Sequence, residues 1–568
     1  MAGLGPKLAR WIPFLKTLAA YDRRWLPNDL AAGLSAAAVQ IPTAIAYAQL
    51  TGLPPVTGLY ACVLPLVAYV FFGSCRQLMV GPDSATCAML AATLAPLASS
   101  GDPHYAELSV AVAIVAAIAC FIGRFMRVGF IADFLSEPIL TGFLNGVALN
   151  IMLGQLNRIF GLKLQSSKFW PMLWETLNKI SHLHLPTTIL GLSLVAFLLL
   201  SKKVAPRVPA ILFAVIAATG AAFLFRFEAK GIAILGTLPA GFAPPLMPNL
   251  KPTEWEMIIP GALGILLVSY CNLILAGRTF AKQGHYDADA NQDLLALGIA
   301  DLATAFSRGF MVSSSTSQTA VAISVGGKTQ LANLVAACVI AAVLVFGTVP
   351  LGFIPQAALG AVLVVSAVRL LDFASLRRYY SISRTEFWLS VVTTFGVLSF
   401  GILQGIVLAV LLALLHLLSQ ISRPNDAVLG KVPGLDGYND ISKHPDATTI
   451  PGLLICRYDA PILFFNADYF KARIYRLLGE SKEQIRCVLL DLETTAIIDI
   501  TGGDALDEVR CHLVQRGIDL KICRARRRAL AILERIGLIA EIGESNLFPS
   551  IRSGVEAFLH TERKEDKR

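Results

Sequence analysis

Charged residues are scarce in this sequence. Asp, Glu, Lys and Arg make up 15% of its 568 residues, whereas soluble domains carry about 25%. Apolar residues make up 55%, and the mean hydropathy is +0.63. The length would allow several soluble domains, but this apolar excess indicates a helical bundle in a membrane.

Metal-site, disulfide and enzyme patterns are missing as well. The 10 cysteines are scattered, with no CxxC pair and no Cys/His cluster at zinc spacing, so we expect neither a disulfide framework nor a metal site. There is no HExxH sequence, acidic metal cluster or nucleophile–base pattern, so we expect no enzymatic activity and no cofactor. The N-terminal residues 1–27 are short, basic and amphipathic and lack a signal-peptide pattern.

Apolar runs of about 20 residues, the length that spans a bilayer, extend from about residue 29 to 421. We count fourteen, of which the third and tenth are short or interrupted by Gly and Pro. They centre near residues 40, 64, 91, 115, 145, 192, 216, 266, 299, 321, 340, 364, 393 and 412.

The charges between these runs predict the orientation of the bundle. With a cytoplasmic N-terminus, Lys and Arg gather in the cytoplasmic loops, whereas the outer loops near 52, 102, 355 and 401 carry none, as the positive-inside rule requires. The net charge of +9 therefore suggests basic cytoplasmic loops and not nucleic-acid binding. Both termini are then cytoplasmic. The loop after the fifth run is the exception, because an outer loop would carry Arg158, Lys163, Lys168 and Lys179.

Two polar clusters begin apolar segments at matching places in the two halves of the bundle. GPDSAT (81–86) opens the third run and SSSTSQT (313–319) opens the tenth. A helix that begins inside the membrane directs unpaired N–H groups and the positive end of its dipole at whatever lies in front of it. Equivalent broken helices in two halves are typical of an inverted-repeat transporter with a midplane site. The clusters therefore predict an anion carrier; two Ser/Thr-rich helix caps are the alternative.

After residue 421 the composition becomes that of a soluble protein. Residues 423–450 are rich in Pro, Gly and Asp and predict a linker. From 451 to 560, expected strands (GLLICRYDA, ILFF, IRCVLLDLE, IDLKICR) alternate with amphipathic helices, which predicts a small α/β domain. Residues 561–568 form a charged tail.

In this order, IPTAIAYAQLTGLPPVTGLYA (41–61), GPDSAT, NQDLLALGIADL (291–302) and SSSTSQTAV, followed by an α/β domain, resemble the sulfate permease (SulP) family with its C-terminal STAS domain. The resemblance covers about residues 28–560. It implies an all-α membrane bundle of seven plus seven helices in inverted repeat at 28–422. It also implies core and gate domains that move in an elevator-like manner, a homodimer, and a cytoplasmic STAS domain. Family substrates are inorganic anions and sometimes dicarboxylates.

The resemblance also implies an anion site between the starts of the third and tenth helices, lined by the first and eighth. The residues that it places there are Thr43, Tyr47, Asp83, Ser84, Thr86, Asn272, Ser315, Ser317 and Gln318.

Two of these positions depart from the family pattern. Many members carry an acid at the place of Asn272, linked to proton or sodium coupling, and many carry an arginine at the place of Gln318. Asn does not titrate in this pH range. The departures put proton coupling in doubt and favour exchange against a counter-anion or uncoupled transport, with H⁺ or Na⁺ as the coupling ions to be tested.

Several single residues have two interpretations. Asp83 either binds a coupling ion or caps a helix, and the side chains of Tyr47, Ser315 and Ser317 either face the anion or serve packing. Asp301 pairs with a polar neighbour or with Arg308, which we favour over a transport role. Thr501 is a phosphorylation site by resemblance to bacterial STAS regulators, or a helix N-cap, which we favour. The cluster Arg524, Arg526, Arg527 and Arg528 meets anionic lipid or is a solvated face.

Three functions follow from these observations. The first is a secondary transporter of an inorganic oxyanion, with sulfate preferred. Chloride, bicarbonate or dicarboxylate transport is the alternative within that class, and a non-transporting anion sensor is the third. Compact loops and the absence of targeting signals suggest a bacterial inner membrane.

Overall fold

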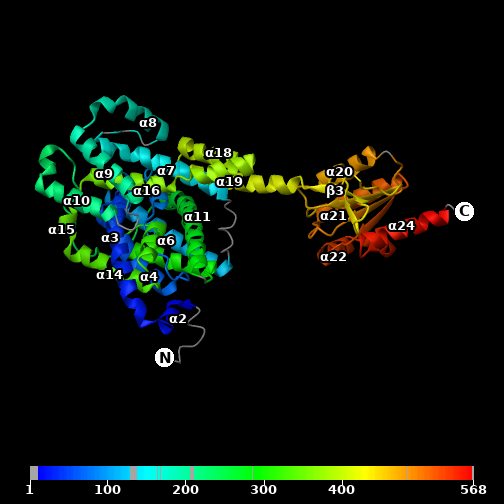
Figure 1. Ribbon diagram of the computed structural model, residues 1–568, viewed down its shortest axis with the longest axis horizontal. Helices are drawn as coiled ribbons and strands as arrows, with labels where there is room; N and C mark the ends of the chain where they lie inside the picture. The colour runs from blue at the N-terminus through cyan, green and yellow to red at the C-terminus, as the bar shows by residue number, and fades with distance from the viewer. Residues whose placement is uncertain are drawn as a thin grey trace. The chain divides into compact units, whose positions relative to one another are not determined.

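The computed structural model describes residues 11–127, 137–162, 164, 166, 168–204, 210–284, 286–444, 446–481 and 483–565. It consists of two compact units, a helical membrane unit that ends at Ala413 and a C-terminal unit that begins at Leu414 (Figure 1). Residues 1–10 of the expected N-terminal segment and 566–568 of the expected tail lie outside the described residues, as does Lys163.

The expected membrane segments are helices. Within the described residues, fourteen helices lie at the predicted positions: α3 (Leu26–Thr51), α4 (Val56–Phe72), α5 (Ser84–Leu94), α6 (Pro103–Met126), α7 (Glu137–Phe160), α9 (Leu185–Val204), α10 (Ala210–Leu224), α11 (Pro252–Gln283), α12 (Ala290–Phe306), α13 (Thr316–Ser324), α14 (Leu331–Phe346), α16 (Gln356–Leu370), α18 (Arg384–Phe400) and α19 (Ile402–Ser422).

Helix length separates the half-helices from the full spans. By length and composition, five stretches of the described chain could cross a membrane: Arg23–Thr51, Pro103–Met126, Glu137–Phe160, Pro252–Lys282 and Gln356–Ile382. In contrast, α5 has 11 residues and α13 has 9. At 1.5 Å per residue they reach only about half of the ~30 Å hydrocarbon layer. The expectation that the third and tenth segments are short is confirmed.

Four further helices were not expected from the sequence, because they are too short to give a membrane signal. They are α2 (Phe14–Ala19), α8 (Phe169–Asn178), α15 (Thr348–Leu351) and α17 (Phe373–Ile382). Single 3₁₀ turns also occur at η1 (Arg23–Trp25), η3 (Ile180–His182) and η4 (Phe227–Lys230).

The membrane helices pack as two sets. In the core set, α12 packs on α4 and α6, α14 on α3 and α4, and α11 on α5 and α6, while α13 lies along α3. In the gate set, α7 packs on α9, α16 and α18, and α10 packs on α9. Glycines allow the closest approaches, as where Gly58 of α4 lies against the Ala44 carbonyl of α3. Helices α3 and α5 of the core set also touch α7, α10 and α16 of the gate set, so the two sets meet along these five helices.

The C-terminal unit is built on a six-stranded sheet in the order β4-β3-β5-β6-β7-β8. Strands β5 to β8 are parallel, and β3 and β4 are antiparallel to their neighbours. The bounds are β3 (Asp426–Lys431), β4 (Tyr438–Asp440), β5 (Leu453–Tyr458), β6 (Cys487–Asp491), β7 (Asp519–Cys523) and β8 (Leu547–Phe548).

Alternate residues of these strands enter two cores, as the period of a strand requires. Leu454, Cys456 and Tyr458 pack with α20 (Ala467–Glu480), α21 (Ile500–Gln515), α22 (Arg527–Arg535) and α23 (Leu538–Ile542). Leu453 and Ile455 pack with α24 (Ile551–Glu565), and the 3₁₀ turn η5 (Glu544–Asn546) precedes β8. The α/β prediction for this region is therefore confirmed.

Three details of that prediction are wrong. Residues 423–450 are not a linker, because β3 and β4 lie there and β3 pairs with β5 along Asp426–Val428. The buried residues Ala427 and Leu429 alternate with less buried neighbours, but the Pro/Gly-rich turn that follows conceals this pattern. ILFF (462–465) is a turn before α20 and not a strand, with one bridge from Ile462 to Ile498. Finally, α24 continues through Glu565, so the expected tail begins as helix.

Candidate functional site

The two half-helices meet at their N-terminal ends. The two-residue strand β1 (Val80–Gly81), just before α5, pairs antiparallel with β2 (Ser313–Ser314), just before α13; Val80 lies opposite Ser314 and Gly81 opposite Ser313. The Ser315 N–H also donates to the Met79 carbonyl at 2.8 Å, and the Met79 N–H donates to Thr319 Oγ1 at 2.9 Å. The structure thus brings GPDSAT and SSSTSQT together, as expected. The positive ends of two helix dipoles converge there.

The two N-cap residues at this junction behave differently. The Asp83 carboxylate accepts the Ala85 N–H at 3.1 Å and so caps α5, which is the contact that the capping interpretation predicts. Ser315 is the N-cap of α13, but its side chain makes no capping bond. Its hydroxyl makes no hydrogen bond to the described residues, so it can donate to a ligand. Ser84, the first residue of α5, is buried.

Helix α3 forms a third wall of the site. Thr43 Oγ1 donates to the carbonyl oxygens of Val39 and Gln40 at 2.9 and 3.0 Å, and it accepts from Gln318 Nε2 of α13 at 3.4 Å. One turn further along, the Tyr47 phenol lies beside the side chains of Ser84 on α5 and Ser366 on α16. Thr43, Tyr47, Ser84 and Gln318 therefore surround one place at the boundary between the core and gate sets.

Several buried polar atoms at this place have no partner within the described chain. They are both amide atoms of Gln40, Thr86 Oγ1, Ser314 Oγ and Gln318 Oε1. A Cβ on Gly81 would lie 2.6 Å from Gln40 Nε2 and 3.8 Å from Gln318 Oε1, so both amides adjoin Gly81. Buried polar groups in proteins are nearly always hydrogen-bonded. This cluster therefore has the character of a site for a polar ligand.

Gln40 is a site residue that the sequence prediction missed. Its side chain is fully buried on α3, three residues before Thr43 and seven before Tyr47, a spacing that places all three on one helix face. That spacing is the signal that identifies it.

Asn272 and Ser317 are the least constrained of the predicted residues. Both are half-buried, and neither side chain makes a hydrogen bond to the described residues. Ser269, one turn before Asn272 on α11, donates to the Val312 carbonyl at 2.9 Å and accepts from Ser313 Oγ through its own carbonyl at 3.2 Å. The face of α11 that carries Asn272 therefore lies against β2.

Asp301 has a structural contact. Its Oδ1 accepts the Val312 N–H at 2.9 Å, and its Oδ2 is buried without a partner in the part of the chain described. Within the described residues Asp301 makes no ion pair with Arg308, so of the two expected partners the polar neighbour is found. The contact holds the segment that leads into β2.

Two carboxylates that the sequence analysis did not single out anchor the loops beside the half-helices. Asp29 of α3 accepts the N–H groups of Lys328 and Thr329 at 2.7 and 3.1 Å and the Thr329 hydroxyl at 2.7 Å. Asp293 of α12 accepts the Ser74 N–H and hydroxyl at 2.8 and 2.9 Å and the Tyr69 hydroxyl at 3.1 Å. The Asp293 bonds hold the segment that leads into β1 and α5, and the Asp29 bonds hold the segment between the end of α13 and the start of α14.

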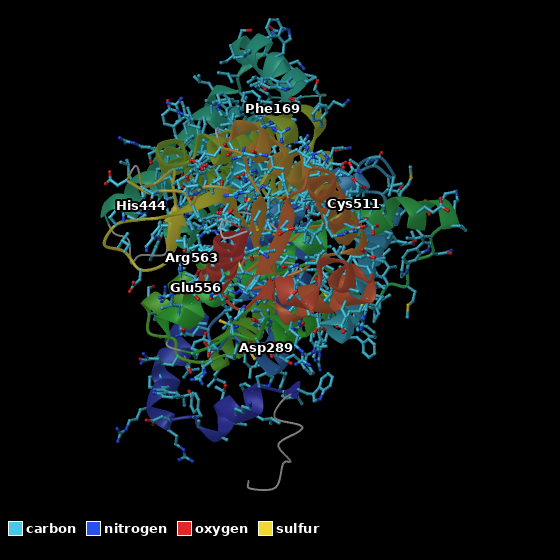
Figure 2. All side chains as sticks on the ribbon, turned by 90° about the vertical axis from the view of Figure 1, so that its right-hand side faces the viewer. Phe169, Asp289, His444, Cys511, Glu556 and Arg563 are labelled. Atoms are coloured by element: carbon cyan, nitrogen blue, oxygen red, sulfur yellow. The ribbon has the colours of Figure 1, made fainter. Side chains whose placement is uncertain are left out.

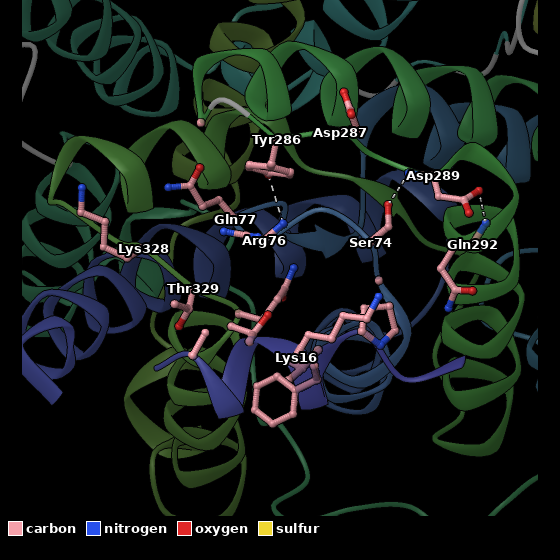
Figure 3. A pocket seen from close by; sticks show the side chains of 18 of the residues that line it. Lys16, Ser74, Arg76, Gln77, Tyr286, Asp287, Asp289, Gln292, Lys328 and Thr329 are labelled. Atoms are coloured by element: carbon pink, nitrogen blue, oxygen red, sulfur yellow. Dashed lines mark hydrogen bonds between the residues drawn. The ribbon is translucent and has the colours of Figure 1, made fainter. Parts of the chain in front are cut away.

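A separate pocket of about 710 Å³ lies beside α2 and these loops (Figure 3). In Figure 3 the Tyr286 hydroxyl accepts the Arg76 N–H, at 3.0 Å, and Ser74 Oγ accepts the Asp289 N–H, at 2.9 Å. The lining of this pocket carries three cations and two carboxylates: Lys16, Arg76, Lys328, Asp287 and Asp289. None of the predicted site residues lines this pocket, and its mixed charge does not favour an anion.

In the C-terminal unit, the N-cap of α21 is Asp499 and not Thr501. The Asp499 carboxylate accepts the Gly502 N–H at 2.7 Å and the Phe464 N–H at 2.8 Å. The interpretation of Thr501 as the cap is therefore wrong, and its side chain is exposed on the first turn of α21. Arg524 pairs with Asp491 and Glu493, and Arg526 donates to the Glu493 carbonyl, so these two are held by the domain itself.

Within the described residues, no group of three or more His, Cys, Asp or Glu side chains could hold a metal ion. The site is built from hydroxyls, amides and helix N-termini around one capping carboxylate. Such groups bind and release an anion without covalent chemistry.

Comparisons with known proteins agree with this arrangement. The profile of the Sulfate permease family matches residues 26–393, and that of the STAS domain matches residues 444–554. A probable sulfate transporter of Mycobacterium tuberculosis (strain CDC 1551 / Oshkosh) is 38% identical over 550 residues, covering 97% of this chain and 98% of that protein. The resemblance drawn from the motifs is thus confirmed.

Solved structures support the fold. The murine solute carrier 26 family member A9 anion transporter in the inward-facing state has a TM-score of 0.89 at 24% identity, covering 98% of this chain and 95% of that one. The transmembrane domain of a cyanobacterium bicarbonate transporter has a TM-score of 0.60 at 20% identity, covering 70% and 98%. At these identities the likeness concerns the fold alone.

Proposed function

Because the chain belongs to the sulfate permease family and is an anion transporter of the membrane rather than an enzyme, we propose that its preferred cargo is sulfate. The observation that carries this proposal is the junction of α5 and α13. Two helix N-termini, the free Ser315 hydroxyl and unpartnered amides converge there on a buried place. An oxyanion accepts several hydrogen bonds at once and matches such a set of donors. The mycobacterial relative is named a probable sulfate transporter, which supports the choice of sulfate.

The proposed mechanism is alternating access of the elevator type. Every predicted site residue in the membrane unit lies on the core set, and the β1–β2 pairing joins its two half-helices into one body. Movement of this body past the gate set would expose the anion to each side in turn. We also propose that the protein works as a homodimer in the bacterial inner membrane.

Uptake of labelled sulfate into proteoliposomes of the purified full-length protein tests the function. Uptake is measured with and without an imposed pH or sodium gradient, and with internal sulfate, chloride or bicarbonate. Accumulation driven by a gradient would establish a coupled carrier and point to Asp83 as the ion-linked group. Uptake only against an internal anion would establish an exchanger. Binding without flux would establish an anion sensor and contradict the transport proposal.

Asn272 makes exchange the favoured mode. No histidine is among the predicted site residues, and Asn272 does not titrate, so uptake by the wild type should vary little between about pH 5 and 8. In Asn272→Glu, the carboxylate ionises as the pH rises and repels the anion. We therefore expect uptake by this variant to be highest at the acidic end and to fall with rising pH. A flat pH profile of initial uptake rates in Asn272→Glu would contradict the placement of this residue beside the anion.

The cysteines of the C-terminal unit provide a test of orientation. Burial raises the pKa of the Cys456, Cys487 and Cys523 thiols to about 12, so they stay protonated and unreactive near neutral pH. Cys511 is exposed (Figure 2). We expect a membrane-impermeant maleimide to modify Cys511 only after the cells are permeabilised. Cys511→Ser is the control, and labelling of Cys511 in intact cells would contradict cytoplasmic termini.

A further inference from the structure

A second cavity lies where four membrane helices end. It measures about 540 Å³ and is lined by the last turns of α3, α5, α7 and α18 together with the start of α8. Phe169 of α8, labelled in Figure 2, and Gln49, Gln155, Arg158 and Lys168 are among its lining residues. We refer to it as the Arg158 cavity. It lies between the core set, which supplies α3 and α5, and the gate set, which supplies α7 and α18.

The lining of the Arg158 cavity carries positive charge and no described carboxylate. Its cations are Arg158 and Lys168, and no Asp or Glu lines it. The nearby Glu175 of α8 is already occupied, because it pairs with Lys179 at 2.8 Å and accepts the Ser166 N–H at 2.9 Å. Arg158 is half-buried and Lys168 is exposed. A partly buried cation without a counter-charge among the described residues is unfavourable, so this composition favours a negatively charged occupant.

Polar atoms in the cavity are left without partners. One guanidinium nitrogen of Arg158, Nη2, donates to the Gln49 carbonyl at 3.3 Å, but Nη1 is buried with no partner in the described chain. Gln155 is 4% exposed and its Oε1 has no partner, and Gln49 Oε1 has none either. If the side-chain amides of Gln49 and Gln155 are flipped, their NH₂ groups take the places of these oxygen atoms and can donate to an anion. The Arg158 guanidinium therefore caps the last turn of α3 with Nη2, while its other edge, at Nη1, has no partner in the described chain.

The cavity adjoins the candidate site. Leu50 lies three residues beyond Tyr47 on the same face of α3, and Ala88 lies four residues beyond Ser84 on α5, a rise of about 6 Å. Ala88, Ala91, Ala92 and Ala95 form the α5 wall, and their small side chains leave the space open. An anion that leaves the site along α5 would therefore enter the Arg158 cavity next.

The cavity also accounts for an anomaly in the distribution of charge. The segment at the end of α7 and after it carries four Lys or Arg residues on the outer side, against the positive-inside rule. Of its four cations, Lys179 is paired with Glu175, and Lys163 lies outside the described residues. The remaining two, Arg158 and Lys168, line the cavity.

We propose that the Arg158 cavity is an external capture site for oxyanions, from which the anion passes to the junction of α5 and α13. The free edge of the Arg158 guanidinium and the amides of Gln49 and Gln155 hold the anion, and Lys168 attracts it at the rim. Because Arg158 also bonds the α3 carbonyl, it links this site to the helix that carries Thr43 and Tyr47. The proposal rests on the proposed anion transport.

The test compares the two sides of the membrane. The KM for labelled sulfate is measured for uptake from outside and for efflux from inside, in the wild type, Arg158→Gln and Lys168→Gln. A charge-assisted hydrogen bond is lost in Arg158→Gln, so its external KM should rise about tenfold, with little change in the internal KM. The external KM of Lys168→Gln should rise less, and mainly at low ionic strength. Lys179→Gln, a paired cation of the same loop outside the cavity lining, is the matched control.

Each outcome separates this proposal from the proposed function. If the wild type carries sulfate and both cavity variants keep its external KM, Arg158 is only a helix cap and the proposal is overturned. Equal changes on both sides would also overturn it. If Arg158→Gln does not reach the membrane, Lys168→Gln and Arg158→Lys still decide the result. Equilibrium binding of labelled sulfate to purified protein gives a second readout, in which Arg158→Gln should remove one site. A wild type that neither binds nor carries sulfate contradicts both proposals.

Discussion

Gln318→Glu is expected to lower sulfate uptake at least a hundredfold. Gln318 is 2% exposed, and its amide lies between Thr43 of α3 and Gly81 at the start of α5. A carboxylate there would face the bound anion. Two like charges about 4 Å apart repel by ~4 kcal/mol at an effective dielectric constant near 20, and each 1.4 kcal/mol corresponds to a factor of ten. Initial uptake rates in proteoliposomes with matched protein content measure the effect.

Two control variants separate charge from the loss of a hydrogen bond. Gln318→Met removes the bond to Thr43 without adding charge, and we expect uptake to fall only several-fold. Gln356→Glu makes the same chemical change at the start of α16, where a helix N-terminus tolerates a carboxylate, and uptake should remain close to that of the wild type. Wild-type uptake by Gln318→Glu would show that this residue does not face the anion.

Gly58→Ala is expected to cause the largest loss of folded protein. A Cβ at Gly58 would lie 2.0 Å from the Ala44 carbonyl oxygen and 2.5 Å from its carbon, and these are backbone atoms that cannot rotate away. Helix α4 must therefore move away from α3. Overpacking of this kind costs about 1–3 kcal/mol and occasionally more. Because Ala44 adjoins Thr43, the displacement would also disturb the site.

The thermal midpoint and the monodisperse fraction of detergent-purified protein measure this loss. The matched control is Gly220→Ala in α10, where an added Cβ meets nothing within 4 Å. Alanine there should be neutral or slightly stabilising, because glycine is a poor helix former. An unchanged thermal midpoint in Gly58→Ala would contradict the close packing of α3 and α4.

The helical segments could be predicted because a membrane leaves few choices. Each spanning backbone must satisfy its own hydrogen bonds, so an apolar run between polar loops is a helix. The polar clusters that begin α5 and α13 could be recognised in the sequence as easily as the apolar runs. What local sequence does not contain is the pairing of Val80 with Ser314, since it depends on the three-dimensional arrangement of the two halves. Symmetry between the halves was the only indication of it.

The predictions that failed concern short strands and a choice between two neighbouring residues that could each cap a helix. Strand β4 has three residues, none of them fully buried, so its period is too short to recognise. Asp499 and Thr501 were both suitable caps two residues apart, and helix ends are uncertain at that scale. Asp499 is the cap, and it also accepts the N–H of Phe464, a residue distant in sequence. Gln40 was missed because its role depends on Gly81 and Gln318, which lie on other elements.

During synthesis, Val80 leaves the ribosome long before its partner Ser314. Asp29 likewise precedes Lys328, and Ser74 precedes Asp293. The first half of the chain must therefore remain in the membrane with these polar groups unpaired until the second half has been inserted. Chains that stop before Gln318 contain no complete site. This interval of synthesis is the stage at which the nascent protein is most exposed to misassembly and proteolysis.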